Sequence, residues 1–239
     1  TDTLLGPNES TVWSITGSNL GSIAGVQFAH TESLVGGLGN DQFVFGAIGA
    51  LASLVDGGGG IDELNYSARP SALTINLANS AASGTGGIQN IERFVGTTLS
   101  DSSIIGPNST NQWEVTGGDT VTLNGSINAT AFNKLLGGTE VDRFIIDPMG
   151  SISGLVNGRG GADTVSYELW ANSVSINLAS LTATALSAFT SIETFIGGQG
   201  QWDQMRGRDV NTSWTIDGPN TGLAGNLRFE AIEIGRAHV

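Results

Sequence analysis

The chain has 239 residues, of which 39% are hydrophobic and 13% are charged, and its formal net charge is −13. This composition is too apolar for a disordered chain and too polar for one that spans a bilayer. The acidic excess disfavours nucleic acid and anionic membranes as partners, so we expect neither nucleic-acid binding nor membrane insertion. The absence of cysteine excludes disulfides and thiol catalysis. The 36 glycines follow no collagen period and therefore predict many tight turns.

A long repeat of about 100 residues organises the chain. Residues 5–17 return as residues 105–117, and Trp214 opens a third copy. Residues 75–78 recur as residues 176–179, at an offset of 101 residues (176 − 75). We therefore predict a first long repeat at residues 1–100 with about five coils, a second at residues 101–202, and the start of a third at residues 203–233.

Both ends of the sequence enter or leave the repeat without a polar capping coil, which a solenoid needs to cover its last rung. We expect the chain to be part of a longer parent chain whose coils continue on either side. Residues 234–239 depart from the repeat and resemble a translated adapter read-through at the end of a metagenomic fragment. We expect these six residues to be a non-native tail.

A shorter period lies inside the long repeat. Branched aliphatic residues recur every 20 residues, with one spacing of 21, and every one precedes Gly, Asn or Asp, or a Thr-Gly pair. Gly, Asn and Asp tolerate the left-handed backbone of a tight turn. We expect coils of about 20 residues in which a short strand ends at a buried aliphatic residue; these aliphatic residues are Ile15, Val35, Val55, Ile75, Val95, Val115, Leu136, Val156, Ile176, Ile196 and Ile216.

The short period selects the fold class. Helical repeats take about 33 to 47 residues and propeller blades about 40 to 50, and the leucine-rich signature is absent. Coils of about 20 residues suit a parallel solenoid in which each strand pairs with its equivalent about 4.8 Å along the axis. We predict an all-β, single-stranded parallel β-helix, and the chirality of parallel crossovers makes right-handed coiling the expectation.

Glycine-aspartate turns carry the candidate chemistry. Residues 36–43 and 57–64 fit the pattern G-G-x-G-x-D-x-U and so resemble the calcium-binding repeats-in-toxin nonapeptide. The resemblance implies calcium held by aspartates and backbone carbonyls of these turns, although the family repeats the nonapeptide in tandem whereas these turns recur once per coil. The alternative is that the glycines form the turn and the aspartates are solvated. The candidate calcium ligands are Asp41, Asp62, Asp142 and Asp163.

Three further sets of residues have competing interpretations. Glutamates three residues before the core position favour a hydrogen-bonded structural role over a ligand or acid role; they are Glu32, Glu92, Glu193 and Glu233. Tryptophans two residues before it share its side of the strand and favour core packing over sugar stacking; they are Trp13, Trp113 and Trp214. His30 alone supports neither a metal site nor a proton relay.

The repeats as a whole resemble bacterial surface proteins of the filamentous-haemagglutinin-like and calcium-binding-repeat adhesin type. The resemblance implies a structural or adhesive segment, extracellular or on the cell surface, with a host-surface, glycan or cell-envelope ligand. A calcium-dependent binding module is the alternative. A carbohydrate-active β-helix would need paired carboxylates and a basic groove, which the scattered basic residues do not indicate, so we expect no enzyme.

Overall fold

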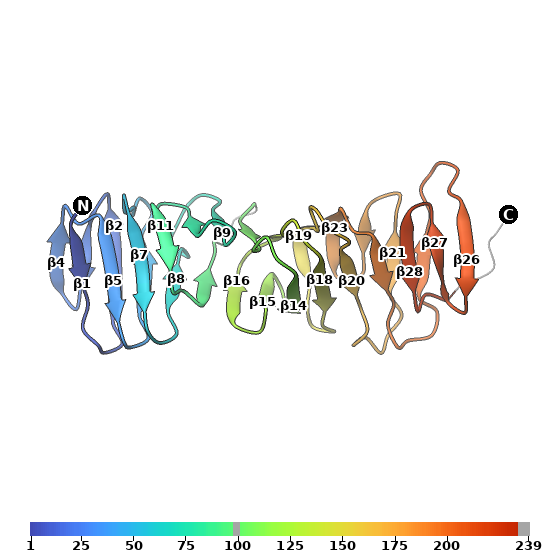
Figure 1. Ribbon diagram of the computed structural model, residues 1–239, viewed down its shortest axis with the longest axis horizontal. Helices are drawn as coiled ribbons and strands as arrows, with labels where there is room; N and C mark the ends of the chain where they lie inside the picture. Colours follow the sequence, from blue (N-terminus) through green and yellow to red (C-terminus); the bar gives the residue numbers. More distant parts are fainter. Residues whose placement is uncertain (98–100, 234–239) are drawn as a thin grey trace. The chain divides into compact units, whose positions relative to one another are not determined.

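The computed structural model describes residues 1–97 and 101–233, and these residues form 28 β-strands (Figure 1). They include no helix, hence none long and apolar enough to cross a membrane. The chain divides into two compact units, Thr1–Ile105 with Ser126–Phe132 (unit 1) and Gly106–Gly125 with Asn133–Val239 (unit 2). The predicted parallel β-helix is confirmed in each unit. The expected non-native tail, residues 234–239, lies outside the described residues.

Unit 1 winds alternately through two main ladders of strands, most of which pair in parallel. The first ladder has the order β1 (Thr3–Leu5), β5 (Ser33–Gly37), β7 (Leu54–Gly58) and β11 (Gly87–Gln89). The second has the order β4 (Val26–Ala29), β3 (Leu20–Ile23), β2 (Val12–Gly17), β6 (Gln42–Phe45), β8 (Glu63–Asn65) and β12 (Arg93–Val95), and β12 also pairs with β16 (Ile127–Thr130). A short ladder of β10 (Ala81–Ala82), β9 (Thr74–Asn76) and β13 (Ser103–Ile105) completes the unit.

Unit 2 is built from two ladders. One ladder has the order β17 (Lys134–Leu136), β19 (Ile152–Asn157), β23 (Leu186–Thr190), β22 (Thr182–Ala183), β21 (Ser175–Asn177) and β25 (Gln204–Arg206). The other has the order β15 (Thr120–Leu123), β14 (Asn111–Gly117), β18 (Asp142–Ile146), β20 (Thr164–Ser166), β24 (Thr194–Ile196), β28 (Leu227–Glu230), β27 (Thr221–Ala224) and β26 (Trp214–Gly218).

Coil length is where the sequence-based prediction is wrong. Leu34 pairs with Val55, 21 residues on, so the expected short coil exists between β5 and β7. Trp13, however, pairs with Phe43, 30 residues on, and the two units together hold about 8 turns of about 30 residues each. The longer coils contain extra strands, such as β3 and β4, that the aliphatic spacing does not reveal. Each long repeat of about 100 residues therefore holds fewer than the five coils expected.

The aliphatic residues spaced by 20 do not form one stacked column. Ile15 lies on the second ladder of unit 1, whereas Val55 lies on the first and Ile75 on the short one. Ile15, Val55 and Ile75 are fully buried, but Val35 and Val95 are only half-buried, because Leu34 and Phe94 next to them point inward. The spacing of 20 therefore relates neighbours along one ladder in some places, as from Val35 to Val55, and strands on different ladders in others, as from Ile15 to Val35.

Antiparallel meanders interrupt the parallel ladders. In unit 1, β2 pairs with β3 and β3 with β4, both antiparallel, and in unit 2 β26, β27 and β28 do the same. The first hairpin turns at Asn19, whose φ of 53° is the left-handed conformation that asparagine tolerates. Alternation along β2 exposes Val12 and buries Trp13 and Ile15. The meanders add rungs that a strictly parallel β-helix lacks.

Stacked aromatic rings fill the core beside the meanders. Trp13 stacks on Phe43 with ring centroids 5.5 Å apart, and Trp113 stacks on Phe144 at 5.6 Å. Each ring pair contributes about 0.5–1.5 kcal/mol beyond the burial of its area. Core packing is confirmed for Trp13 and Trp113, which are fully buried. It is wrong for Trp214, whose exposed fraction is 43%.

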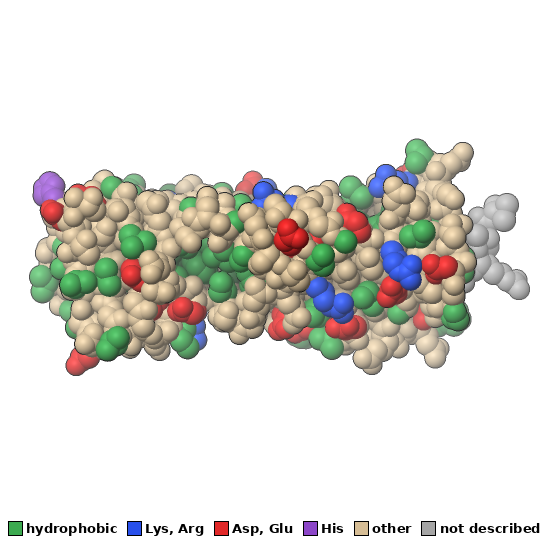
Figure 2. Space-filling model, viewed as in Figure 1, with side chains coloured by type: hydrophobic (Ala, Val, Ile, Leu, Met, Phe, Trp, Pro, Cys, Tyr) green, Lys and Arg blue, Asp and Glu red, His purple; other side chains and the backbone are tan. Residues whose placement is uncertain are grey.

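Charged side chains are scattered over the face of the molecule seen in Figure 2, among small and polar residues. The ion pairs of Arg143, Arg206 and Arg228 are exposed; Arg143 with Glu168 at 2.6 Å is an example. Exposed pairs of this kind contribute little to stability, about 0–1 kcal/mol. The polar interactions that join neighbouring coils are buried, and they lie at the turns that precede strands such as β6, β8 and β20.

Candidate functional site, a buried carboxylate ladder

The four aspartates of the glycine-rich turns lie inside the coils. Asp41 is 2% exposed, and Asp62, Asp142 and Asp163 are fully buried. In unit 1, Asp41 comes just before β6 and Asp62 just before β8, and these two strands pair with each other. In unit 2, Asp142 begins β18 and Asp163 comes just before β20, and these strands also pair. Strand pairing therefore brings Asp41 near Asp62 and Asp142 near Asp163. The interpretation that these aspartates are solvated is wrong, because the turn folds each side chain back under its own glycines.

In unit 1 the carboxylates bind the main chain of the preceding coil. The N–H of Thr11 donates to Asp41 Oδ1 at 2.9 Å, and the N–H of Asp41 donates to Asp62 Oδ1 at 2.7 Å. The N–H of Asp62 in turn donates to Glu92 Oε2 at 2.9 Å. Each bond spans one coil. We call Asp41, Asp62 and Glu92 the carboxylate ladder of unit 1.

Unit 2 contains the matching carboxylate ladder of Asp142, Asp163 and Glu193. The N–H of Asp142 donates to Asp163 Oδ1 at 2.7 Å, and the N–H of Asp163 donates to Glu193 Oε2 at 2.8 Å. The first rung differs: Asp142 Oδ1 accepts from the side-chain amide of Asn111 at 2.7 Å and from Trp113 Nε1 at 3.3 Å. Asp142 Oδ2 accepts from the N–H of Gly138 at 2.6 Å.

The first glycine of each turn makes room for the aspartate. A Cβ on Gly57 would overlap both Asp62 Oδ2 and the carbonyl oxygen of Asn90 in the next coil. A Cβ on Gly36 would meet Asp41 Oδ2 and the carbonyl oxygen of Gly57 in the same way. Gly137, Gly158 and Gly197 show the same conflict. The glycines are therefore explained by close packing of a buried carboxylate against the next coil.

Burial dominates the electrostatics of the ladders. It raises the pKa of Asp62 to about 6, an effect that the N–H of Asp41 opposes and the negative charges of Asp41 and Glu92 reinforce. In unit 2 burial likewise raises the pKa of Asp163 to about 6, with Asp142 and Glu193 as the neighbouring charges. Burial also raises the pKa of Asp41 and of Asp142. The ladders therefore hold carboxyl groups that ionise less readily than exposed ones.

Three carboxylate oxygens in the ladders lack a hydrogen-bond donor, namely Oδ2 of Asp41, Asp62 and Asp163. A buried acceptor without a partner costs about 1–3 kcal/mol. Calcium would supply such oxygens with a positive charge, and it takes 6–8 oxygen ligands. Within residues 1–97 and 101–233, no group of three or more His, Cys, Asp or Glu side chains is arranged to hold a metal ion. Calcium binding by Asp41, Asp62, Asp142 and Asp163 stays a prediction of the sequence.

The recurring glutamates are hydrogen-bonded to the main chain, which confirms their expected structural role. Glu92 and Glu193 end the carboxylate ladders. Two other glutamates accept from the main chain just before β1 and just before β25. Glu32 Oε2 accepts from the N–H of Asp2 at 2.7 Å, and Glu233 Oε2 accepts from the N–H of Asp203 at 2.6 Å. Each of these four glutamates follows its donor by 30 residues.

Asp203 is a buried carboxylate that the sequence patterns did not single out as a site residue. It is fully buried, and its oxygens accept from the N–H groups of Val174 at 2.8 Å and Gly198 at 2.6 Å. Its turn holds one residue more than the turn before Asp41. The preceding Trp202 points outward, 72% exposed, with a φ of 77°. The constant 30-residue spacing of donor and glutamate was the signal that could have revealed these corners.

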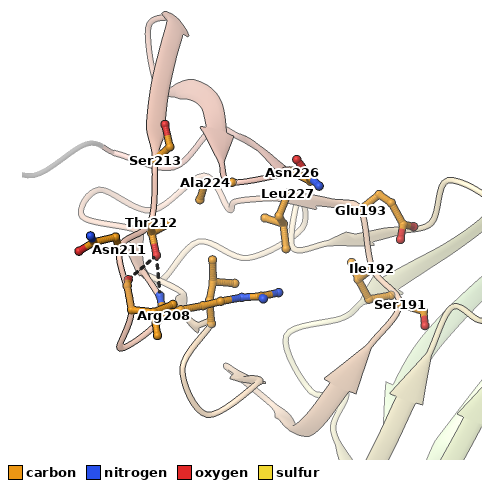
Figure 3. A pocket seen from close by; sticks show the side chains of 13 residues that line it. Ser191, Ile192, Glu193, Arg208, Asn211, Thr212, Ser213, Ala224, Asn226 and Leu227 are labelled. Atoms are coloured by element: carbon orange, nitrogen blue, oxygen red, sulfur yellow. Dashed lines mark hydrogen bonds between the residues drawn. The ribbon is translucent and has the colours of Figure 1, made fainter.

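A hollow of about 470 Å³ lies on the surface of unit 2 (Figure 3). Arg208, residues 210–213, the turn of residues 224–227 and residues 191–193 line it, together with Leu178. Thr212 Oγ1 accepts from the N–H of Arg208 at 3.2 Å and donates to the carbonyl of Val210, which fixes the loop. Its one acidic side chain, Glu193, already serves the ladder, so the hollow lacks the carboxylate pair of a glycosidase.

Comparisons with protein-family models, with curated proteins and with solved structures found nothing that matches this chain.

Proposed function

We propose that this chain is a structural and adhesive segment of a large bacterial repeat protein that is secreted or held at the cell surface. The observation that carries the proposal is the use of the recurring polar side chains. Asp62, Asp163 and the recurring glutamates bind the main chain of the neighbouring coil. Because the recurring polar side chains hold neighbouring coils together, they support a structural role for the repeats.

The chemistry of the surface agrees with this proposal. The acidic net charge keeps a β-rich chain soluble outside the cell, and the exposed ion pairs are scattered. Ligands at a host surface, on a glycan or in the cell envelope are the partners that such a segment would contact. We expect no catalysis.

The proposal is tested with the full chain displayed on bacterial cells. Cells that carry it should adhere to surfaces coated with glycans or extracellular-matrix proteins more strongly than cells carrying a Gly/Ser chain of equal length. A variant that unfolds one unit, Gly57→Val, should lower adhesion, whereas Gly59→Ala should not. Equal adhesion of all four strains would overturn the proposal. Soluble sugar released from a polysaccharide by the purified chain would favour a carbohydrate-active enzyme instead.

A second candidate function is a calcium-dependent binding module, favoured by the unpartnered Oδ2 atoms of Asp41, Asp62 and Asp163. Thermal melts followed by far-UV circular dichroism, first in EDTA and then in millimolar calcium, test it. A rise in melting temperature that Asp41→Asn and Asp62→Asn together abolish would support calcium ligation. Identical melts in both conditions would leave the ladders as a purely hydrogen-bonded device.

A further inference from the structure

An Asn-x-Ser/Thr sequence stands in the loop that precedes each of the strands β2, β14 and β26, once in each copy of the long repeat. The three sequences are Asn8-Glu9-Ser10, Asn108-Ser109-Thr110 and Asn211-Thr212-Ser213. The central residue differs in every copy, and in the third copy the asparagine lies three residues before the tryptophan of the strand instead of five. The pattern thus persists although its residues and its place in the loop change. With a central residue other than proline, it is the acceptor sequence for N-linked sugars.

The three loop asparagines, Asn8, Asn108 and Asn211, are exposed and their side chains are unbonded. Within residues 1–97 and 101–233, none of their side-chain amides takes part in a hydrogen bond. Figure 3 shows the amide of Asn211 pointing outward from its loop. The loops themselves are held in place: the N–H of Asn40 donates to Ser10 Oγ at 3.0 Å, and Thr212 Oγ1 donates to a carbonyl of its own loop at 3.2 Å. Each acceptor nitrogen is therefore presented on an ordered surface loop.

Three further Asn-x-Ser/Thr sequences, which begin at Asn65, Asn124 and Asn128, provide an internal comparison. Asn65 Nδ2 donates to Glu63 Oε1 at 2.9 Å, and Asn124 Nδ2 donates to Asn111 Oδ1 at 3.0 Å. Asn128 lies within strand β16, which pairs with β12. The six acceptor sequences therefore divide by structure into three whose asparagine nitrogen is unbonded in a loop and three whose asparagine is held by a hydrogen bond or by strand pairing.

We propose that Asn8, Asn108 and Asn211 are acceptor sites for N-linked sugars, one in each copy of the long repeat. The donor is a sugar that carries a diphosphate ester at C1, and a glycosyltransferase brings it to the loop. The asparagine Nδ2 forms a bond to C1 while the bond between C1 and the diphosphate oxygen breaks. The diphosphate leaves with the bonding electron pair, and Nδ2 gives one proton to a base of the transferase. Exposed loops admit the transferase and the sugar without breaking a contact between coils. The inference goes beyond the proposed function and does not depend on adhesion.

The test compares the folded full chain with a proteolytic digest of the same chain. Both are incubated with an Asn-x-Ser/Thr-specific glycosyltransferase and a nucleoside-diphosphate hexose, and in parallel with a membrane oligosaccharyltransferase and a polyprenyl-diphosphate oligosaccharide. Peptide mapping by mass spectrometry measures the occupancy of each asparagine, and the reaction that labels the chain identifies the class of donor. In the folded chain the three loop asparagines should carry about ten-fold more sugar than the three held asparagines, because access depends on the surface loop. In the digest this preference should largely disappear.

A matched pair of variants in the second loop checks the acceptor sequence itself. Thr110→Ala should abolish labelling of Asn108 and leave Asn8 and Asn211 labelled, whereas Ser109→Ala, which keeps the acceptor sequence, should leave all three labelled. Circular dichroism verifies that both variants fold. Equal occupancy of all six asparagines in the folded chain, or labelling confined to the digest, would overturn the inference. So would labelling of Asn108 that survives Thr110→Ala, or a lack of labelling by both transferases.

Discussion

The carboxylate ladders of the two units share their last two rungs and differ at the first. In unit 1, the main-chain N–H of Thr11 donates to Asp41 Oδ1, and Asp41 Oδ2 has no partner. In unit 2, Asn111 offers a side-chain amide to Asp142, and the N–H of Gly138 binds the second oxygen. The corner has the same geometry in both units, although one of the two carboxylate oxygens of Asp41 accepts no hydrogen bond. Glycine packing, rather than complete pairing of the carboxylate, fixes the position of the ladder.

The largest expected effect is on the feature that both ladders share, the first glycine. Gly57→Ala forces a methyl group onto Asp62 and onto the carbonyl of Asn90, so we expect a loss of about 3 kcal/mol of stability. Gly158→Ala in unit 2 should cost a similar amount. The controls are Gly59→Ala and Gly160→Ala in the same turns, where an added Cβ meets only ordinary contacts. Urea unfolding measures all four, and a harmless Gly57→Ala would contradict the packing argument.

The second effect separates hydrogen bonding from charge. Asp62→Ala removes the acceptor of the buried Asp41 N–H and should destabilise unit 1 by about 2 kcal/mol. Asp62→Asn retains an acceptor oxygen and removes a desolvated charge, so at pH 8 it should be neutral or stabilising. Hydrogen exchange at the Asp41 amide reports the bond directly. If Asp62→Asn were as damaging as Asp62→Ala, the charge itself would be required, as calcium ligation would demand.

The third effect is a pH dependence common to both units. The pKa values of Asp62 and Asp163 are about 6 in the folded chain, against 3.8 for an unperturbed aspartate carboxyl group. The folded state thus binds their protons more tightly than the unfolded state. Their stabilising contribution is complete below about pH 4 and is lost as the pH rises through 6. We expect stability to fall by on the order of 2 kcal/mol per aspartate at most across this window.

Urea midpoints measured from pH 4 to pH 8 test this dependence. The double variant Asp62→Asn and Asp163→Asn should flatten the part of the pH profile that belongs to the ladders. Repulsion among the exposed carboxylates should remain, so the variant serves as its own control. A profile unchanged by the double substitution would show that the ladders do not titrate in this range.

The smallest expected effect concerns the difference between the two first rungs. Thr11→Asn should bring a side-chain amide to Asp41, as Asn111 does for Asp142, and raise the stability of unit 1 by about 1 kcal/mol. The reverse change, Asn111→Thr, should lower that of unit 2 by a similar amount. Amide exchange resolved by residue can assign each change to its unit. Stability changes of the same sign in both variants would mean that the first rung is not the cause.

Much of the fold was predictable because the stacked strands repeat their residue types. The 21-residue coil between β5 and β7 follows from the aliphatic spacing, and the fold class follows from the coil. The meanders were missed because β3 and β4 add residues without adding a new aliphatic spacing. The aspartates were predicted as site residues, but a glycine-rich context favoured a solvated turn or a calcium loop. The spacing of 30 between Asp62 and Glu92 was visible in the sequence, yet only strand register gives it meaning.

The turn before Asp203 shows how this architecture accommodates insertions. Gly197 and Asp203 are six positions apart, one more than Gly36 and Asp41, yet both glycines pack against the carboxylate in the same way. The additional residue is absorbed outside, where Trp202 takes a left-handed backbone and faces solvent. Such turns can therefore gain residues in evolution and change the side chains on the surface. The buried glycine–aspartate contact keeps the strands of neighbouring coils in register.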